Sequence, residues 1–177
     1  GGLHRSDLLI LAARPGMGKT SFALSIACAA AREHQARIGM FSMEMSKEQI
    51  LERLLSTVTN IDMQRLRLGH LDSNHLTGEE HDRMIEATAL LSSLDIYVDD
   101  SPLLTPSEMR GKARRLHQEV GGLDMIILDY MQLMSGNSAG ENRVQQMGEI
   151  SRSLKGVARE LDVPLMALSQ LNRAVEQ

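Results

Sequence analysis

The segment Ala13–Thr20 constrains the fold of this chain more than any other, because of what stands on either side of it. Residues 8–12 form a short apolar run, and residues 21–32 have helical spacing. A strand, a turn with two glycines and a helix start, closed by Gly-Lys-Thr, are the context of a phosphate-binding loop. Gly16 and Gly18 allow consecutive backbone N–H groups to face one anion, and the helix directs its positive end to the same point.

The loop supplies a set of candidate nucleotide contacts: Arg14, Pro15, Gly16, Met17, Gly18, Lys19, Thr20 and Ser21. Lys19 can reach the β- and γ-phosphates as a point charge, and the Thr20 hydroxyl is placed to bind Mg²⁺. The pattern departs from its usual form at Ala13, where the first glycine is expected. Position 13 ends the strand, and it mainly requires a small side chain. A turn that uses glycine for geometry alone is the alternative interpretation.

Short apolar runs alternate with amphipathic runs along the rest of the chain. We expect further strands at 37–43, 95–98, 125–129 and 163–169, with a short helix over 62–68 and a long one over 143–161. Capping boxes at Ser46 and Thr77, and a cap at Thr105 followed by Pro106, predict three more helix starts. Five strands separated by helices predict an α/β fold with a mainly parallel sheet flanked by helices. In the first helix, Phe22, Ile26 and Ala30 recur at helical spacing.

The amino-acid composition of the chain narrows the range of functions that it can have. The 177 residues suffice for one domain, and no apolar run approaches the roughly 20 residues that span a bilayer. The lone Cys28 excludes disulfides within the chain and fits a reducing cytoplasm. A net charge of −4 neither indicates nor excludes nucleic-acid binding. With two Phe and two Tyr residues, a base-stacking platform is not expected, so any single strand would be held by its phosphates.

Polar residues stand at the carboxyl ends of three predicted strands, where parallel sheets bind ligands. Asp129 is placed to hold Mg²⁺ beside the Thr20 hydroxyl, or it caps the next turn. Glu44 is placed to polarise the water that attacks a γ-phosphate, or it is a solvated turn residue. Gln170 can hydrogen-bond the γ-phosphate or that water, and a solvated glutamine is the alternative.

Taken together, these motifs resemble the RecA-type motor domain of the DnaB family of bacterial replicative helicases. The resemblance covers essentially the whole chain and is carried by residues 13–20, 41–45, 98–101, 127–133, 149–155 and 168–173. It implies a RecA-like fold, a homohexameric ring, Mg²⁺-dependent ATP hydrolysis at subunit interfaces, and translocation on single-stranded DNA that unwinds duplex at the replication fork. It also implies Lys19 and Thr20 on phosphate and Mg²⁺, Glu44 as the base, Asp129 in the metal shell and Gln170 as the γ-phosphate sensor.

The same resemblance implies a primase and a helicase loader as partners, no membrane, and a cytoplasmic location at the nucleoid and replisome. Two family segments are absent: the amino-terminal primase-binding domain, and the carboxy-terminal end of the motor with the arginine finger and main DNA-binding loop. We therefore expect residues 1–177 to be a single RecA-like ATPase domain, a piece that binds nucleotide but hydrolyses it weakly, since an arginine finger contributes about 10³- to 10⁵-fold in rate.

DNA contact within the chain is expected at Asn142 and Arg143, at the end of a polar loop that could face a central channel. A solvated loop is the alternative interpretation. Two other function classes stay open: a RecA-like ATPase of DNA recombination or remodelling, and a helicase loader or regulator that uses ATP as a conformational switch.

Overall fold

The computed structural model describes residues 2–71, 76–134 and 143–171. Its elements, in chain order, are β1 (Leu8–Ala13), α1 (Lys19–His34), β2 (Ile38–Ser42), α2 (Lys47–Thr59), α3 (Met63–Leu71), α4 (Gly78–Ser92), β3 (Ile96–Asp99), α5 (Pro106–Glu119), β4 (Met125–Asp129), the 3₁₀ turn η2 (Met131–Leu133), α6 (Arg143–Leu161) and β5 (Leu165–Gln170).

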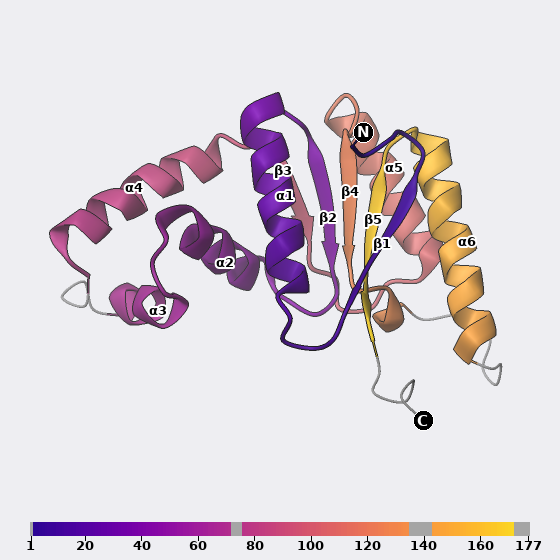
Figure 1. Cartoon of the computed structure of the whole chain (residues 1–177). Coiled ribbons are helices and arrows are strands. Elements are labelled where there is room, and N and C mark those ends of the chain that lie inside the picture. Colours follow the sequence, from indigo (N-terminus) through magenta and orange to yellow (C-terminus); the bar gives the residue numbers. More distant parts are fainter. Residues whose placement is uncertain (1, 72–75, 135–142, 172–177) are drawn as a thin grey trace.

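The strands form a single five-stranded sheet in the order β1-β5-β4-β2-β3, and every pair of neighbours is parallel (Figure 1). All five predicted strands are present, with ends that shift by one or two residues. The prediction of a parallel α/β sheet flanked by helices is confirmed. Because the strands run parallel, their carboxyl ends meet at one edge, which lies at the bottom of Figure 1 together with the start of α1.

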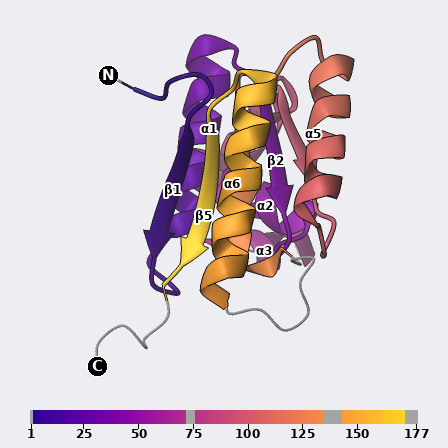
Figure 2. The ribbon, with the colours of Figure 1, turned by 90° about the vertical axis from the view of Figure 1, so that its right-hand side faces the viewer.

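Helices cover both faces of the sheet, which explains why its strands are continuously apolar. Figure 2 shows α5 and α6 on one face and α1 on the other. Successive residues of β4 point to opposite faces, so Ile126 and Leu128 belong to the core under α5 and α6. Met125 and Ile127 belong to the core under α1 and α2. The sheet is thereby fixed in register by two apolar layers.

The three predicted helix caps are confirmed, and each is a capping box. Ser46 accepts a hydrogen bond from the Gln49 N–H, and the Gln49 side chain accepts one from the Ser46 N–H in return, at the start of α2. Thr77 and Glu80 start α4 in the same way, and Thr105 and Glu108 start α5 with Pro106 in its first turn. Each cap stabilises its helix by about 1 kcal/mol.

The stripe of residues at helical spacing, Phe22, Ile26 and Ala30, is not the buried face of α1. Phe22 is 56% exposed, and the buried side chains are Ala23, Leu24, Ala27, Cys28 and Ala31. Four of these five side chains are Ala or Cys, which lets the helix axis approach the sheet closely. Ile26 and Ala30 are partly buried against the same core, and Phe22 is exposed.

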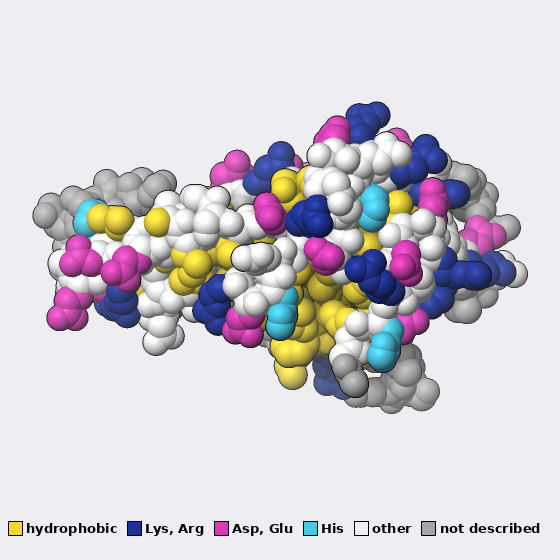
Figure 3. All heavy atoms as spheres, turned by 90° about the horizontal axis from the view of Figure 1, so that it is seen from above, with side chains coloured by type: hydrophobic (Ala, Val, Ile, Leu, Met, Phe, Trp, Pro, Cys, Tyr) yellow, Lys and Arg dark blue, Asp and Glu magenta, His cyan; other side chains and the backbone are white. Residues whose placement is uncertain are grey.

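The helices α2, α3 and α4 extend from one side of the sheet as an arm (Figure 1). Within this arm, Arg65 of α3 pairs with the buried Glu80 of α4 at 2.6 Å. Viewed from above, onto the amino-terminal ends of the strands, Figure 3 shows Lys and Arg side chains interspersed with Asp and Glu. Mixed charges do not attract a polyanion strongly. None of the described helices combines the length and apolar character needed to cross a lipid bilayer.

Candidate active site

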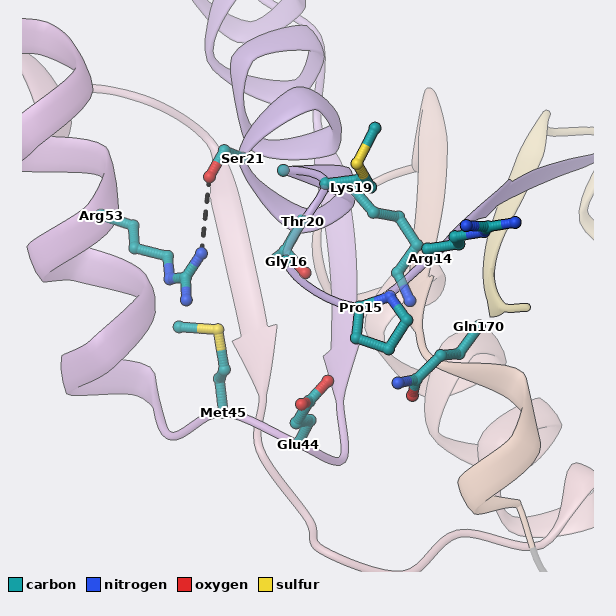
Figure 4. Close-up of a pocket in the computed structure, with 12 residues that line it drawn as sticks. Arg14, Pro15, Gly16, Lys19, Thr20, Ser21, Glu44, Met45, Arg53 and Gln170 are labelled. Atoms are coloured by element: carbon teal, nitrogen blue, oxygen red, sulfur yellow. Dashed lines mark hydrogen bonds between the residues drawn. The ribbon is translucent and has the colours of Figure 1, made fainter. Parts of the chain in front are cut away.

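A pocket of about 390 Å³ lies at the carboxyl edge of the sheet, where the predicted loop and the strand ends meet (Figure 4). It is lined by Arg14, Pro15, Gly16, Met17, Gly18, Lys19, Thr20, Ser21, Glu44, Met45, Arg53 and Gln170. All eight predicted loop residues line it, together with two of the three predicted strand-end residues. The third, Asp129, lies buried behind the loop.

Sheet pairing brings these residues together from distant parts of the sequence. Ala13, at the start of the loop, is the register partner of Gln170 on β5. Ser42, two residues before Glu44, is the partner of Asp129, and the Met43 N–H donates to the Asp129 carbonyl at 2.8 Å. The four strands that carry the site are therefore consecutive neighbours in the sheet.

The loop has the backbone conformation that its glycines permit. Gly16 and Gly18 have φ angles of +76° and +78°, which other residues adopt only with strain. A Cβ atom at either position would meet no atom within 4 Å, so the glycines are required for backbone conformation and the space beside them is open. Gly18 caps α1 without a side-chain hydrogen bond. The positive end of that helix thus faces the pocket, where an anion can bind its N–H groups.

Lys19 is held at the loop by an aromatic ring. Its ammonium group lies 4.8 Å from the centroid of Tyr130, the residue after Asp129. The negative face of the ring attracts the cation by about 0.5–1 kcal/mol at such a partly exposed site. The Lys19 side chain is therefore positioned before any phosphate arrives.

Thr20 and Asp129 form the oxygen pair that the sequence predicted. The Thr20 Oγ1 donates to Asp129 Oδ2 at 2.7 Å, and Asp129 is fully buried. Burial raises the pKa of the Asp129 carboxyl, against the hydrogen bond from Thr20 and the charges of Lys19 and Arg53. Its Oδ1 has no hydrogen-bond partner among the described residues. A buried carboxylate oxygen left open beside a hydroxyl fits a hard divalent cation such as Mg²⁺.

Asp129→Asn tests this assignment. We expect the nucleotide-free variant to have a Tm at least equal to that of the wild type, because a neutral amide avoids the cost of burying a charge. The rise in Tm on adding Mg·ATP should shrink, since an amide oxygen holds Mg²⁺ more weakly than a carboxylate. Both values come from thermal unfolding with and without Mg·ATP.

Asp124→Asn is the matched control, because this carboxylate accepts from the Arg37 N–H at 2.9 Å and does not line the pocket. It should lower the Tm and leave the nucleotide effect unchanged. The same pattern at Asp129 would mark that residue as purely structural.

Glu44 and Gln170 approach the loop from two different strands. Figure 4 shows them on opposite sides of Pro15. Glu44 is exposed in the turn after β2, and the turn is held because Ser42 Oγ donates to the Met45 carbonyl at 2.8 Å. Gln170 ends β5 and is half-buried. Both side chains line the same pocket as the loop.

Arg53 and Met45 also line the pocket, and the sequence analysis missed both. Arg53 on α2 donates from Nη1 to Ser21 Oγ at 3.4 Å, and its buried Nε has no partner among the described residues. The sequence did contain a signal for Arg53. This residue lies between Ile50 and Leu54, which are both buried, so its charge stands beside the apolar face of α2. A guanidinium there suits a phosphate.

The predicted DNA contacts are not tested by the structure. Asn142 lies outside the described residues. Arg143 begins α6, but its side chain also lies outside the described part of the chain. Both remain predictions.

The chain is similar to known proteins over nearly its whole length. Replicative DNA helicases DnaB from Geobacillus stearothermophilus and Synechocystis are each 49% identical over 177 residues, which is 99% of this chain. The chain spans 38% and 20% of their lengths, respectively. A solved DnaB-like replicative helicase, described with its interactions with primase, superposes with a TM-score of 0.90 at 33% identity, covering 99% of this chain and 41% of that one.

A solved ATPase domain gives the same TM-score of 0.90 at 33% identity, covering 99% of this chain and 61% of its own. These neighbours agree with the RecA-like fold that the motifs predicted. Residues 1–177 also match the model of the family described as the DnaB-like helicase C-terminal domain. The chain therefore belongs to the DnaB-like helicase C-terminal domain family.

Proposed function

We propose that this chain is one RecA-like ATPase domain and the motor of a replicative DNA helicase, driven by Mg²⁺-dependent ATP hydrolysis. The observation that carries the proposal is the pocket itself, where a glycine-bearing loop, Lys19 and the Thr20–Asp129 pair meet Glu44 and Gln170. The relatives that the chain matches are named replicative DNA helicases. Both lines of support concern the same residues, because the motifs shared with these relatives are the ones that build the pocket.

In the bound state, the backbone of the loop holds the α- and β-phosphates and Lys19 neutralises the β- and γ-phosphates. Thr20 Oγ1 and Asp129, directly or through water, are the oxygen groups for Mg²⁺. The ion supplies charge neutralisation on the β- and γ-phosphate oxygens when bound. Arg53 adds a second cation on the α2 side of the pocket.

Glu44 is the residue that we assign to water activation. Its carboxylate accepts a hydrogen bond from the attacking water, whose oxygen bonds to the γ-phosphorus as the bond to the β–γ bridging oxygen breaks. The proton of that water passes by way of Glu44 to the products, ADP and inorganic phosphate. Gln170 hydrogen-bonds the γ-phosphate and so distinguishes ATP from ADP.

The family match supports a proposal for the activity of the whole protein. We propose a homohexameric ring that moves on single-stranded DNA and unwinds duplex at the replication fork, with Asn142 and Arg143 near the DNA phosphates. Primase and a helicase loader are its proposed partners, and the cytoplasm, at the nucleoid, is its proposed location. The DNA recombination or remodelling class and the loader class are not favoured by the family match.

The test uses the protein at its natural length on forked DNA with Mg·ATP. We expect strand separation that requires hydrolysable ATP, and ATP turnover that rises when single-stranded DNA is added. Turnover stimulated by single strands without any unwinding would indicate a recombination or remodelling ATPase. Turnover indifferent to single strands would indicate a switch-type loader. Either result would overturn the proposal.

A further inference from the structure

Gln132 in the turn η2 makes contacts that the proposed mechanism does not use. Its Nε2 donates to Ser169 Oγ at 2.7 Å and to the Gln170 carbonyl at 3.0 Å. Its Oε1 accepts from the Gln170 N–H at 3.2 Å. One side-chain amide thus binds both main-chain polar groups of the proposed γ-phosphate sensor.

The sheet topology explains why this bond is needed. On one side, β5 stays paired with β1 as far as Ala13 and Gln170. On the other side, the pairing of β5 with β4 ends at Leu128 and Ala167, because β4 turns into η2. The last residues of β5 therefore extend beyond the neighbouring strand. A primary amide carries the same donor and acceptor pair as a peptide unit, so Gln132 replaces the missing strand partner.

The position of η2 connects this bond to the rest of the pocket. Within four residues, Asp129 binds Thr20, the Tyr130 ring holds Lys19, and Gln132 binds Gln170. The phosphate loop, the proposed metal ligand and the proposed sensor are therefore all attached to one short segment. Movement of η2 relative to β5 would displace the Gln170 main chain and, with it, its side chain at the pocket.

We propose that Gln132 is a positioning residue that sets the distance of Gln170 from the γ-phosphate, and thereby the discrimination between ATP and ADP. The proposal rests on the proposed function, because it needs a triphosphate in the pocket. Gln132 itself does not line the pocket, so it acts through Gln170.

The test measures Kd for ADP and for the β,γ-imido analogue of ATP, using the protein at its natural length. Gln132→Met keeps the length of the side chain and removes its donor and acceptor. We expect the Kd of the triphosphate analogue to rise about 5- to 10-fold, the typical net contribution of one hydrogen bond, while the Kd of ADP stays within about twofold. Gln118→Met, at an exposed position on α5, is the matched control and should change neither value.

A double-mutant cycle separates positioning from a general loss of structure. If Gln132 acts only through Gln170, the variant carrying both Gln132→Met and Gln170→Ala binds the analogue within about twofold of Gln170→Ala alone. Additive losses in the double variant would overturn the proposal. So would an equal loss of ADP affinity, or an unchanged analogue affinity in Gln132→Met.

Ser169→Ala keeps the proposal testable if Gln132→Met does not fold. It removes only the hydroxyl that accepts from Gln132, and it should raise the Kd of the analogue about two- to fourfold with no change for ADP. An unchanged ratio between the two nucleotides would overturn the proposal. Failure of the wild type to bind either nucleotide would instead overturn the proposed function.

Discussion

Lys19→Ala should lower kcat/KM for ATP at least about 10³-fold in the protein at its natural length, because it removes a cation aimed at the charge that develops during phosphoryl transfer. The variant also loses the ammonium group held over Tyr130, 4.8 Å from the ring centroid. Steady-state phosphate release gives the rate. The rise in Tm on titration with Mg·ATP should nearly vanish, since a 100-fold loss of affinity removes about 2.7 kcal/mol of stabilisation at a fixed ligand concentration.

The matched control for Lys19→Ala is Arg32→Ala at the opposite end of α1, where Arg32 is exposed and pairs with Glu33. Loss of that surface pair should change the free energy of unfolding by no more than about 1 kcal/mol and leave turnover unchanged. Full turnover in Lys19→Ala, or an equal Tm rise with Mg·ATP, would contradict the assignment of the loop.

Glu44→Gln should separate binding from hydrolysis. The amide has the size of the carboxylate but cannot take a proton from water, so turnover should fall about 10²- to 10⁴-fold. Glu44 is exposed in its turn, so the variant should fold with an unchanged Tm. Mg·ATP should bind with an affinity within about threefold of the wild type. Phosphate release and nucleotide titration measure the two effects independently.

Glu79→Gln, an exposed carboxylate in the first turn of α4, serves as the control for Glu44→Gln and should leave turnover at the wild-type level. If Glu44→Gln lowers affinity and leaves turnover at saturating ATP unchanged, Glu44 contributes to ground-state binding and not to water activation. If neither changes, Glu44 is a solvated turn residue and the base must be sought elsewhere in the pocket.

Local signals predicted the elements of the fold well. Each capping box predicts a helix start because its two side chains bond to backbone groups three residues away, with no help from the rest of the chain. The strand 125–129 was predictable because both faces of a parallel sheet are buried and its first four residues are uniformly apolar. The buried face of α1 was not predictable from periodicity alone. Phe22 and Ala23 are neighbours in the helix, and only the tertiary packing decides that Ala23 is buried and Phe22 exposed.

The positions of the strand ends in the sequence predicted three residues of the candidate site. Asp129, Glu44 and Gln170 each follow or end an apolar run, which places them at the carboxyl edge of any parallel sheet. Arg53 was missed because its role depends on how α2 packs beside α1, which brings its Nη1 within 3.4 Å of Ser21. The contact between Gln132 and Gln170 could not be predicted from the sequence either, because it requires that β4 and β5 be neighbours and that β4 end first.

The parallel pairing of the strands also determines where the site residues lie along the sheet. Ala13 is aligned with Gln170, and Ser42 with Asp129, only because the apolar layers hold each strand at one axial offset. A slip of two residues preserves the alternation of faces yet displaces a strand end by about 6.6 Å, farther than any hydrogen bond reaches. A substitution in the middle of β4, for instance at Ile127, can therefore abolish catalysis by shifting the strand, although it contacts no reacting group.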